Sequence, residues 1–292
     1  MAPAVIVYLA FIVYPFLTSI RYSLYNWDGV GPLSDFIGTG NFAFIFSPSG
    51  FLPFLLRAFV HNLYFFLLSF VLSVVLGLLL AFLLFNVNEK ASRFFQALYF
   101  IPYVIPPIVI GYMFSIYLEP GFGLLSTLAT NLHLSFLNVA FLGEPSLALP
   151  TVAGIAAWAG MGFPVLVFLA ALIGIPRELF DAAKVDGAGG FNTFLHVVFP
   201  MLRSTFLTVV TLTWIGSFAV FDLVYVLEGT QAGPNYATDV LGTLFYRTAW
   251  GGFGATAQGM GLAAAVAIVG FVFVMAIATG FVWLQRRIAV EV

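Results

Sequence analysis

The chain lacks cysteine and carries very little charge. Charged side chains are 8% of the 292 residues, whereas soluble domains carry about 25%. Without cysteine, disulfides and thiolate chemistry are excluded and the redox compartment cannot be read. A net charge of -2 leaves no basic footprint, which excludes nucleic-acid binding. A water-soluble fold of this length could not bury so much apolar surface.

Apolar side chains are what the sequence has in abundance. Hydrophobic residues make up 62% of the chain, including 35 Phe, and the mean hydropathy is +1.08. Because a helix needs about 20 apolar residues to cross a bilayer, we predict an all-α integral membrane protein with six transmembrane helices. The expected spans are Ala2–Ile20, Leu63–Phe85, Phe94–Leu118, Leu147–Ile175, Thr205–Leu227 and Thr256–Leu284.

The first apolar run has an alternative interpretation as a cleaved signal peptide. However, no Lys or Arg precedes it, Pro15 lies within it, and no clean small-residue cleavage site follows. We therefore expect a retained span.

The third expected span contains Pro102, Pro106 and Pro107. Proline removes a backbone donor and kinks a helix, which a membrane tolerates when neighbours satisfy the freed carbonyls. We expect one bent helix here rather than a moving hinge.

The positions of Lys and Arg predict the orientation, because cytoplasmic loops are enriched in both. One side holds only Arg21, Arg57 and Arg247. We therefore expect both termini and the central loop in the cytoplasm, on the side that holds Lys90, Arg93, Arg177, Lys184, Arg203, Arg286 and Arg287.

The most polar long segment is the central loop, residues 176–203. Pro176 suits a first helical position, and Gly187, Gly189 and Gly190 are typical of a helix end and a sharp turn. A second short helix is expected at Phe191–Val198, before Pro200. Two interpretations stay open from the residues alone: an amphipathic hairpin on the membrane surface, or a docking surface for a subunit in the water phase. The residues that would contact such a subunit are an apolar patch and two flanking charges: Leu179, Phe180, Ala183, Asp181 and Asp186.

The spacing within this loop carries a resemblance. Asp181-Ala182-Ala183, then Gly187, then Val197-x-Phe199-Pro200 resembles the EAA loop of permeases in binding-protein-dependent ABC importers. Three mild departures are Asp181 for the usual Glu, Val197 for Ile and Phe199 for Leu.

Other stretches are similar to the sugar permeases of the MalF type within that family. They are Tyr14-Pro15, Gly40-Asn41-Phe42, Ile101-Pro102 through Pro106, and Phe221–Leu227. The resemblance covers nearly the whole chain, most firmly Ala58–Leu284. Many relatives carry a charged cytoplasmic segment before the first span, and its absence here leads us to expect a truncated or mis-started chain.

The resemblance implies a type I ABC importer permease fold with a cytoplasmic coupling helix, in a prokaryotic inner membrane. Residues 1–57 would form the first span and an external connection, residues 58–284 the importer domain, and residues 285–292 a cytoplasmic C-terminus. The implied partners are a second permease, two ATP-binding subunits and an extracytoplasmic solute-binding protein. The resemblance assigns ATPase coupling to Asp181, Ala182, Ala183, Asp186, Gly187 and Pro200.

The sequence agrees that the energy comes from a partner. A P-loop needs G-x-x-x-x-G-K-[ST], but Lys90 follows Glu89 and Lys184 follows Ala183. We expect a transport subunit rather than an enzyme, with no cofactor of its own and with ATP and Mg bound by the partner ATPase. No metal site is expected, because the three histidines fall in different expected loops without ligand spacing: His61, His133 and His196.

A sugar site needs hydroxyl or amide groups beside aromatic rings. By alignment outward from the EAA loop, the resemblance places five residues where the maltose-type permease contacts its sugar, and Phe221 lies one turn further. The alternative is ordinary packing, since Thr and Ser often bond to neighbouring helices in membranes. The tentative substrate-binding residues are Gly160, Phe163, Thr213, Ser217, Val220 and Phe221.

Asp222 lies near the expected outer end of the fifth span. Ionisable residues inside membranes are candidates for function, but at an interface Asp222 would be hydrated or capped by Tyr225 or Arg247. We favour the structural role.

Taken together, these features predict half of an import pathway for a di- or oligosaccharide or a related polyol. The alternative is an ion-coupled secondary transporter of a small polar solute. That class should bury ionisable groups mid-membrane, and none falls at the middle of an expected span. The sequence specifies neither the solute nor the partner permease.

Overall fold

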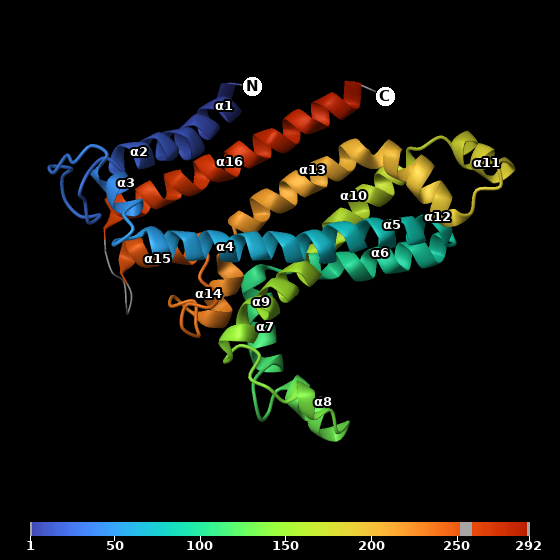
Figure 1. The fold of residues 1–292 in the computed structure, drawn as a ribbon, viewed down its shortest axis with the longest axis horizontal. Coiled ribbons are helices and arrows are strands. Elements are labelled where there is room, and N and C mark those ends of the chain that lie inside the picture. The colour runs from blue at the N-terminus through green and yellow to red at the C-terminus, as the bar shows by residue number, and fades with distance from the viewer. Residues whose placement is uncertain (1, 252–258, 291–292) are drawn as a thin grey trace.

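A computed structural model describes residues 2–251 and 259–290. These residues form helices, together with an isolated antiparallel bridge between Tyr25 and Phe36. Figure 1 shows an elongated bundle with α11 at one end, α3 and α15 at the other, and an arm that carries α8. Among the described residues, five helices are long and apolar enough to cross a membrane, or up to six if a bent pair counts as one span.

The first span packs beside the last. The helices α1 (Ala2–Tyr8) and α2 (Tyr14–Tyr22) are joined by a π-helical stretch, η1 (Leu9–Val13), and α2 contacts α16 (Met260–Val290). This agrees with the expected first span. Most of its apolar side chains are exposed, as suits a helix that faces lipid. The expected start of the sixth span, Thr256, lies outside the described residues.

The second span begins well before its expected start. After the short α3 (Gly40–Ile45), α4 (Leu52–Ser69), η2 (Phe70–Val75) and α5 (Leu76–Asn86) form one continuous helix of 35 residues. The expected start at Leu63 was wrong because Arg57 and His61 made the preceding turns look like a loop. Both side chains have polar partners inside the protein.

The third span is broken rather than bent. The helices α6 (Glu89–Val104) and α7 (Pro107–Tyr117) meet at 95°. A residue that precedes proline is pushed out of the helical region, and the pair Pro106–Pro107 applies this constraint twice. Ile105 and Pro106 accordingly have ψ angles of 129° and 138°. The prediction of one bent helix was therefore wrong.

Beyond α7, the chain forms the protruding arm with α8 (Leu124–Asn131) and a 3-10 turn, η3 (Ser135–Leu137). It returns through α9 (Pro145–Gly160) and α10 (Gly162–Ile173), which together make the fourth span. Gly162 lets α10 pack closely on α6, because a Cβ at this position would overlap the carbonyl oxygen of Tyr99. The arrangement places α9 beside α4 and beside the break in the third span.

The fifth span starts earlier and stops sooner than expected. The segments α12 (Gly190–Thr193), η4 (Phe194–Val198) and α13 (Phe199–Phe218) form one continuous helix of 29 residues. The expected short helix at Phe191–Val198 is therefore the start of the span itself. The helix ends at Phe218, and α14 (Asp222–Glu228) and α15 (Leu241–Trp250) follow outside the spanning helices.

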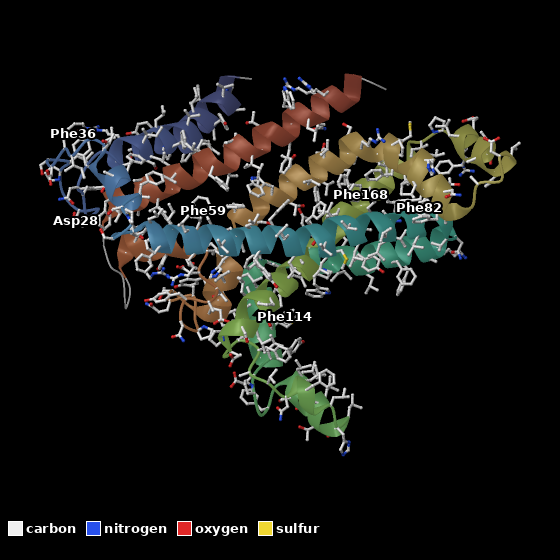
Figure 2. The ribbon with its side chains drawn as sticks, viewed as in Figure 1. Asp28, Phe36, Phe59, Phe82, Phe114 and Phe168 are labelled. Atoms are coloured by element: carbon white, nitrogen blue, oxygen red, sulfur yellow. The ribbon has the colours of Figure 1, made fainter. Side chains whose placement is uncertain are left out.

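Aromatic rings fill the space between these helices. Phe82 packs on Phe194 and Phe168 on Phe206 toward the α11 end, whereas Phe59 packs on Phe218 toward the opposite end. Figure 2 shows Phe59, Phe168 and Phe82 at successive positions along the length of the bundle. Buried side chains therefore form clusters toward both ends of the bundle, and the partly buried Phe66 packs against both of these clusters.

Candidate functional site

The central loop contains one well-defined helix, α11 (Arg177–Val185). Pro176 has an extended ψ of 133° and directly precedes this helix, one position before the expected one. At the other end, Gly187 N–H donates to Lys184 O and Ala188 N–H donates to Ala183 O, at 3.0 and 2.9 Å. This paired ending needs a left-handed residue, and Gly187 supplies it with φ +73°.

The helix α11 has an inner and an outer face. Phe180 packs on Phe85 of α5 with ring centroids 5.3 Å apart, and Ala183 is 8% exposed. Leu179 points outward at 39% exposed. The expectation that Leu179, Phe180 and Ala183 form one outward patch was therefore wrong. The predicted coupling residues on the outer face are Asp181, Ala182, Asp186 and Gly187.

The charges on the outer face pair weakly. Lys184 Nζ lies 3.4 Å from Asp181 Oδ1, and both side chains are more than 70% exposed. Surface pairs of this kind contribute about 0–1 kcal/mol to folding. Pro200, the remaining predicted coupling residue, is half-buried in the first turn of α13, directly after the π-helical η4. It therefore shapes the base of the loop rather than its outer face.

A cavity of about 420 Å³ lies between α4, η2, α6, α9, α10 and α13. A second cavity of about 300 Å³ adjoins it, and both are lined by Gly160 and Val220. Phe221 lines the second cavity only. The first cavity is also lined by Phe163, Thr213 and Ser217, so all six predicted substrate residues lie around one continuous region. Their role in binding stays a prediction.

Some hydroxyl groups around the first cavity are already engaged. Ser217 Oγ donates to Thr213 O at 2.8 Å within its own helix, and Ser73 Oγ donates to Ala157 O at 2.8 Å. The hydroxyl proton of Ser217 is therefore used within its own helix, as the packing alternative expected. The hydroxyl oxygen of Ser217 can still accept a hydrogen bond. A solute would thus find hydroxyl oxygens and an aromatic face. The lining is mostly apolar, as is usual for small-molecule sites.

Tyr103 and Asp222 belong to this region but were not among the predicted site residues. Tyr103 lines both cavities and stacks on Phe163 with centroids 5.8 Å apart. The only sequence signal for it was its place just before the Pro106–Pro107 pair. Asp222 is exposed and lines the second cavity. Arg247 is directed elsewhere, to Asp239, so the capping of Asp222 by Arg247 was wrong and hydration agrees with its exposure.

The end of α13 beside the cavities is held by Asn62 of α4. Its side chain donates to Ser217 O at 2.7 Å and accepts from Leu241 N–H at 2.8 Å. Asn62 is 0% exposed. Asn62 thereby provides partners for one carbonyl in the last turn of α13 and one N–H in the first turn of α15. Groups at helix ends have no partner within their own helix.

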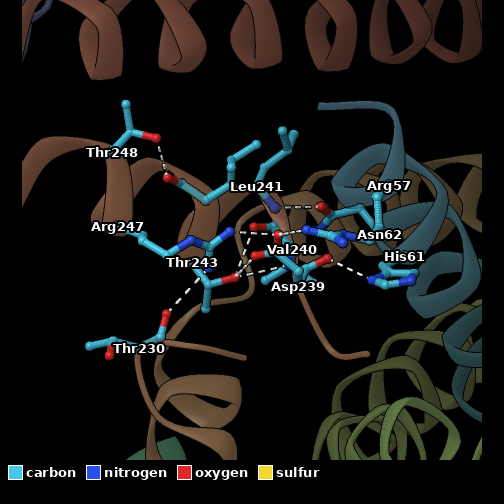
Figure 3. A network of polar contacts seen from close by, with 11 residues as sticks. Arg57, His61, Asn62, Thr230, Asp239, Val240, Leu241, Thr243, Arg247 and Thr248 are labelled. Atoms are coloured by element: carbon cyan, nitrogen blue, oxygen red, sulfur yellow. Dashed lines mark hydrogen bonds and ion pairs between the residues drawn. The ribbon is translucent and has the colours of Figure 1, made fainter. Parts of the chain in front are cut away.

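A network around Asp239 lies next to Asn62 (Figure 3). The carboxylate is 0% exposed and accepts from Arg247 at 2.7 Å, from Arg57 at 3.4 Å and from Thr243 at 2.9 Å. Tyr236 packs against both guanidinium groups, whose carbons are 4.8 and 4.9 Å from its ring centroid.

His61 lies within α4, where its Nδ1 is 2.7 Å from the backbone oxygen of Asp239. The placement of His61 in a loop was therefore wrong. Among the described residues, no group of three His, Cys, Asp or Glu is arranged to hold a metal ion.

Comparison with known proteins supports the resemblance seen in the sequence. The chain is 32% identical to the probable ABC transporter permease protein YurN of Bacillus subtilis, covering 93% of this chain and 90% of the relative. It is 31% identical to the diacetylchitobiose uptake system permease protein NgcF of Streptomyces coelicolor, covering 88% and 75%. It is also 31% identical to the sn-glycerol-3-phosphate transport system permease protein UgpA of Pectobacterium atrosepticum, covering 86% and 82%.

The fold is similar to that of solved importers. A chain of a bacterial ABC transporter involved in alginate import superposes with a TM-score of 0.80 at 24% identity, covering 98% of this chain and 93% of that one. The expected type I permease fold is thereby confirmed. Residues 73–290 match the family model for these permeases. The chain is thus a multi-pass membrane permease, and it belongs to the family of binding-protein-dependent transport system inner membrane components.

Proposed function

We propose that this chain forms half of the translocation pathway of an ATP-driven sugar importer, with a di- or oligosaccharide or a related polyol as its solute. The observation that carries the proposal is the separation of two features along the bundle. The exposed helix α11 lies at one end of the bundle (Figure 1). The cavities lie away from that end, beside the break between α6 and α7. Relatives named for diacetylchitobiose and multiple sugars support the solute class.

The outer face of α11 is the proposed contact for a separate ATPase subunit. Asp181, Ala182 and Asp186 are exposed there, and the small Ala182 permits close approach of another surface. Ala183 acts from the inner face by seating the helix on its own chain. We assign ATP and Mg to two partner subunits, and we add a second permease and an extracytoplasmic solute-binding protein.

We further propose that α11 and both termini are cytoplasmic in a prokaryotic inner membrane. The Lys and Arg distribution supports this orientation. Arg57 and Arg247, which belong to the arginine-poor side, meet at Asp239 at the end of the bundle remote from α11. Arg247 is 4% exposed and Arg57 31% exposed, and both are paired with the Asp239 carboxylate, which reduces the positive charge that they add to that surface.

The test is uptake by proteoliposomes that contain this chain, its partner permease, both ATPase subunits and the binding protein. A saccharide panel is first screened for binding to that binding protein. Import should require ATP inside and should not follow from a proton or sodium gradient alone. Uptake driven by an ion gradient with this chain alone would overturn the proposal.

The cavity is tested by Phe163→Ala and by Thr213→Val, which remove a ring and a hydroxyl from the first cavity. Both should abolish or strongly reduce import while the complex still assembles. Phe136→Ala, a 70% exposed ring on the arm, is the matched control. Wild-type import by both cavity variants would remove this cavity from the pathway.

A further inference from the structure

Three arginines lie near the ends of two neighbouring helices and pair with no carboxylate in the part of the chain that the structure describes. Arg203 lies near the start of α13, whereas Arg286 and Arg287 lie near the end of α16. All three side chains are exposed. Neither α13 nor α16 contains an Asp or a Glu. We call these three residues the basic cluster.

The two helix ends are held together by Gln285. Its Nε2 lies 3.2 Å from Ser204 O, 3.1 Å from Ser204 Oγ and 2.8 Å from Thr208 Oγ1. Ser204 directly follows Arg203, and Gln285 directly precedes Arg286. The contacts of Gln285 therefore bring the arginine-bearing turns of both helices together, toward the end of the bundle at which α11 lies (Figure 1).

One face of α16 points away from α13 and carries Trp283 and Arg287. Each of these residues is two positions from Gln285, which places it about 200° around the helix. The guanidinium carbon of Arg287 lies 3.9 Å from the ring centroid of Trp283, and the ring is 54% exposed. Val282 and Leu284 beside it are also exposed. This end of α16 is therefore apolar up to Trp283 and cationic directly beyond it.

The length of α16 places Trp283 at the level of lipid headgroups. The helix begins at Met260, where Gly261 N–H donates to Trp27 O at 2.9 Å. Trp283 follows Met260 by about 23 residues, or about 35 Å at the helical rise, whereas the hydrocarbon core is about 30 Å thick. Because tryptophan is enriched at both membrane–water interfaces, Trp27 and Trp283 mark the two interfaces. Arg287, one turn beyond Trp283, then reaches the phosphates.

The chemistry of the basic cluster matches a lipid phosphate. A guanidinium group presents N–H donors in a fork that fits phosphate oxygens. Stacking on Trp283 uses the face of the Arg287 group and leaves its edge able to donate. A soluble partner would have to displace the lipid that covers the apolar side chains beside this ring, whereas a phospholipid brings its own acyl chains to them.

We propose that the basic cluster binds the phosphate headgroup of an anionic phospholipid, whose acyl chains lie along α16 on the bilayer side of Trp283. Three cations without a nearby carboxylate favour a lipid with net negative charge over a zwitterionic one. The proposal requires only that the chain spans a bilayer, so it goes beyond the solute and the energy source proposed above.

The test measures lipid binding to the purified full chain in detergent by native mass spectrometry. Phosphatidylglycerol should be retained in preference to phosphatidylcholine with the same acyl chains. Arg286→Gln/Arg287→Gln should weaken the binding of phosphatidylglycerol about thirtyfold, as expected for two cations near a headgroup. Thermal unfolding of this variant without added lipid should match wild type, because both side chains are exposed.

Arg177→Gln/Lys184→Gln is the matched control, since it removes two exposed cations from α11 at the same end of the bundle. It should retain the wild-type affinity for phosphatidylglycerol. Equal losses in the two double variants, or equal retention of the two lipids by wild type, would overturn the proposal.

Two further outcomes would assign the basic cluster to another ligand and overturn the lipid site. One is binding of inorganic phosphate or glycerol 3-phosphate as tightly as phosphatidylglycerol, which would identify a site for a soluble anion. The other is wild-type lipid binding by Arg286→Gln/Arg287→Gln together with loss of the co-purifying ATPase subunit, which would identify a subunit contact. No part of the lipid assay needs transport, so its result is independent of whether the complex imports a sugar.

Discussion

The two ends of the molecule use charge in opposite ways. At the α11 end, Asp181 and Lys184 are 72% and 74% exposed and touch at 3.4 Å. At the other end, Asp239 and Arg247 are 0% and 4% exposed and bond at 2.7 Å. Both ends contain an aspartate beside a cation, but only one pair is removed from water.

This difference distinguishes charged groups that stay accessible at the surface from charged groups that hold the fold together. An exposed pair adds little to folding, so the charges of α11 are free to meet another protein. A buried aspartate must be fully paired, and Asp239 is bonded by three side chains from α4 and α15. The Asp239 network therefore holds α15 against α4, next to the end of α13 and the cavities. The predictions below test this contrast, from the largest expected effect to the smallest.

Replacing Asp239 with Ala should have the largest effect. Arg247 would remain buried without its carboxylate, and breaking a buried pair in this way costs about 3–5 kcal/mol. Thermal unfolding of the detergent-solubilised protein measures the loss. Asp181→Ala is the control and should cost less than about 1 kcal/mol. Equal losses at the two positions would erase the contrast between the ends.

Replacing Asn62 with Leu should cost a comparable or slightly smaller amount. Ser217 O and Leu241 N–H would each lose a buried partner, at about 1–3 kcal/mol for each group left unpaired. The same unfolding assay applies, with Asn192→Leu on the exposed surface near α11 as the control. An Asn62→Leu variant as stable as wild type would show that the junction between α13 and α15 does not need this bridge.

Gly187→Ala should have a moderate effect at the opposite end. With φ at +73°, an alanine there pays about 1–2 kcal/mol for the left-handed conformation. The loss should be local, seen as faster proteolysis within residues 176–203, with little change in global unfolding. Gly187→Asn is the matched variant, because Asn tolerates this conformation better, and it should be cut more slowly than Gly187→Ala. Equal cleavage in both variants would argue against the strained turn.

The smallest effect should be a pH dependence at Glu228, the last residue of α14. Burial raises the pKa of its carboxyl from 4.5 to about 8, and its Oε1 has no hydrogen-bond partner among the described residues. Between these two values the folded state keeps the proton while the unfolded state loses it. Folding stability should therefore fall as pH rises from about 4.5 to 8.

Glu228→Gln should remove this dependence, which unfolding midpoints measured at pH 5 and pH 8 would reveal. Because the side chain is only partly buried, solvent should moderate the effect. An identical pH profile in wild type and Glu228→Gln would exclude this carboxyl as its source.

Much of the architecture could be predicted from local sequence. Apolar runs long enough to cross a bilayer predicted the spans, because a backbone in lipid must satisfy its own hydrogen bonds. The spacing from Asp181 to Pro200 identified the family. The six candidate substrate residues also lie around the cavities, although their alignment came from the family resemblance rather than from the residues alone.

The errors arose where the decisive contact was distant in sequence. Arg57 and His61 seemed to exclude a helix until Asp239, more than 170 positions away, supplied their partners. The fifth span seemed to reach Leu227 because its apolar run continues, whereas its helix ends at Phe218, where Asn62 bridges Ser217 to α15.

The sequence by itself therefore determined the membrane class, most of the apolar spans and the polar central loop with its short helix, because each depends on neighbours a few positions apart. Only the tertiary structure decided which face of α11 is free, where the third and fifth spans break, and which rings surround the cavities. Those outcomes depend on polar partners and packing surfaces supplied by other helices, and no local pattern contains them.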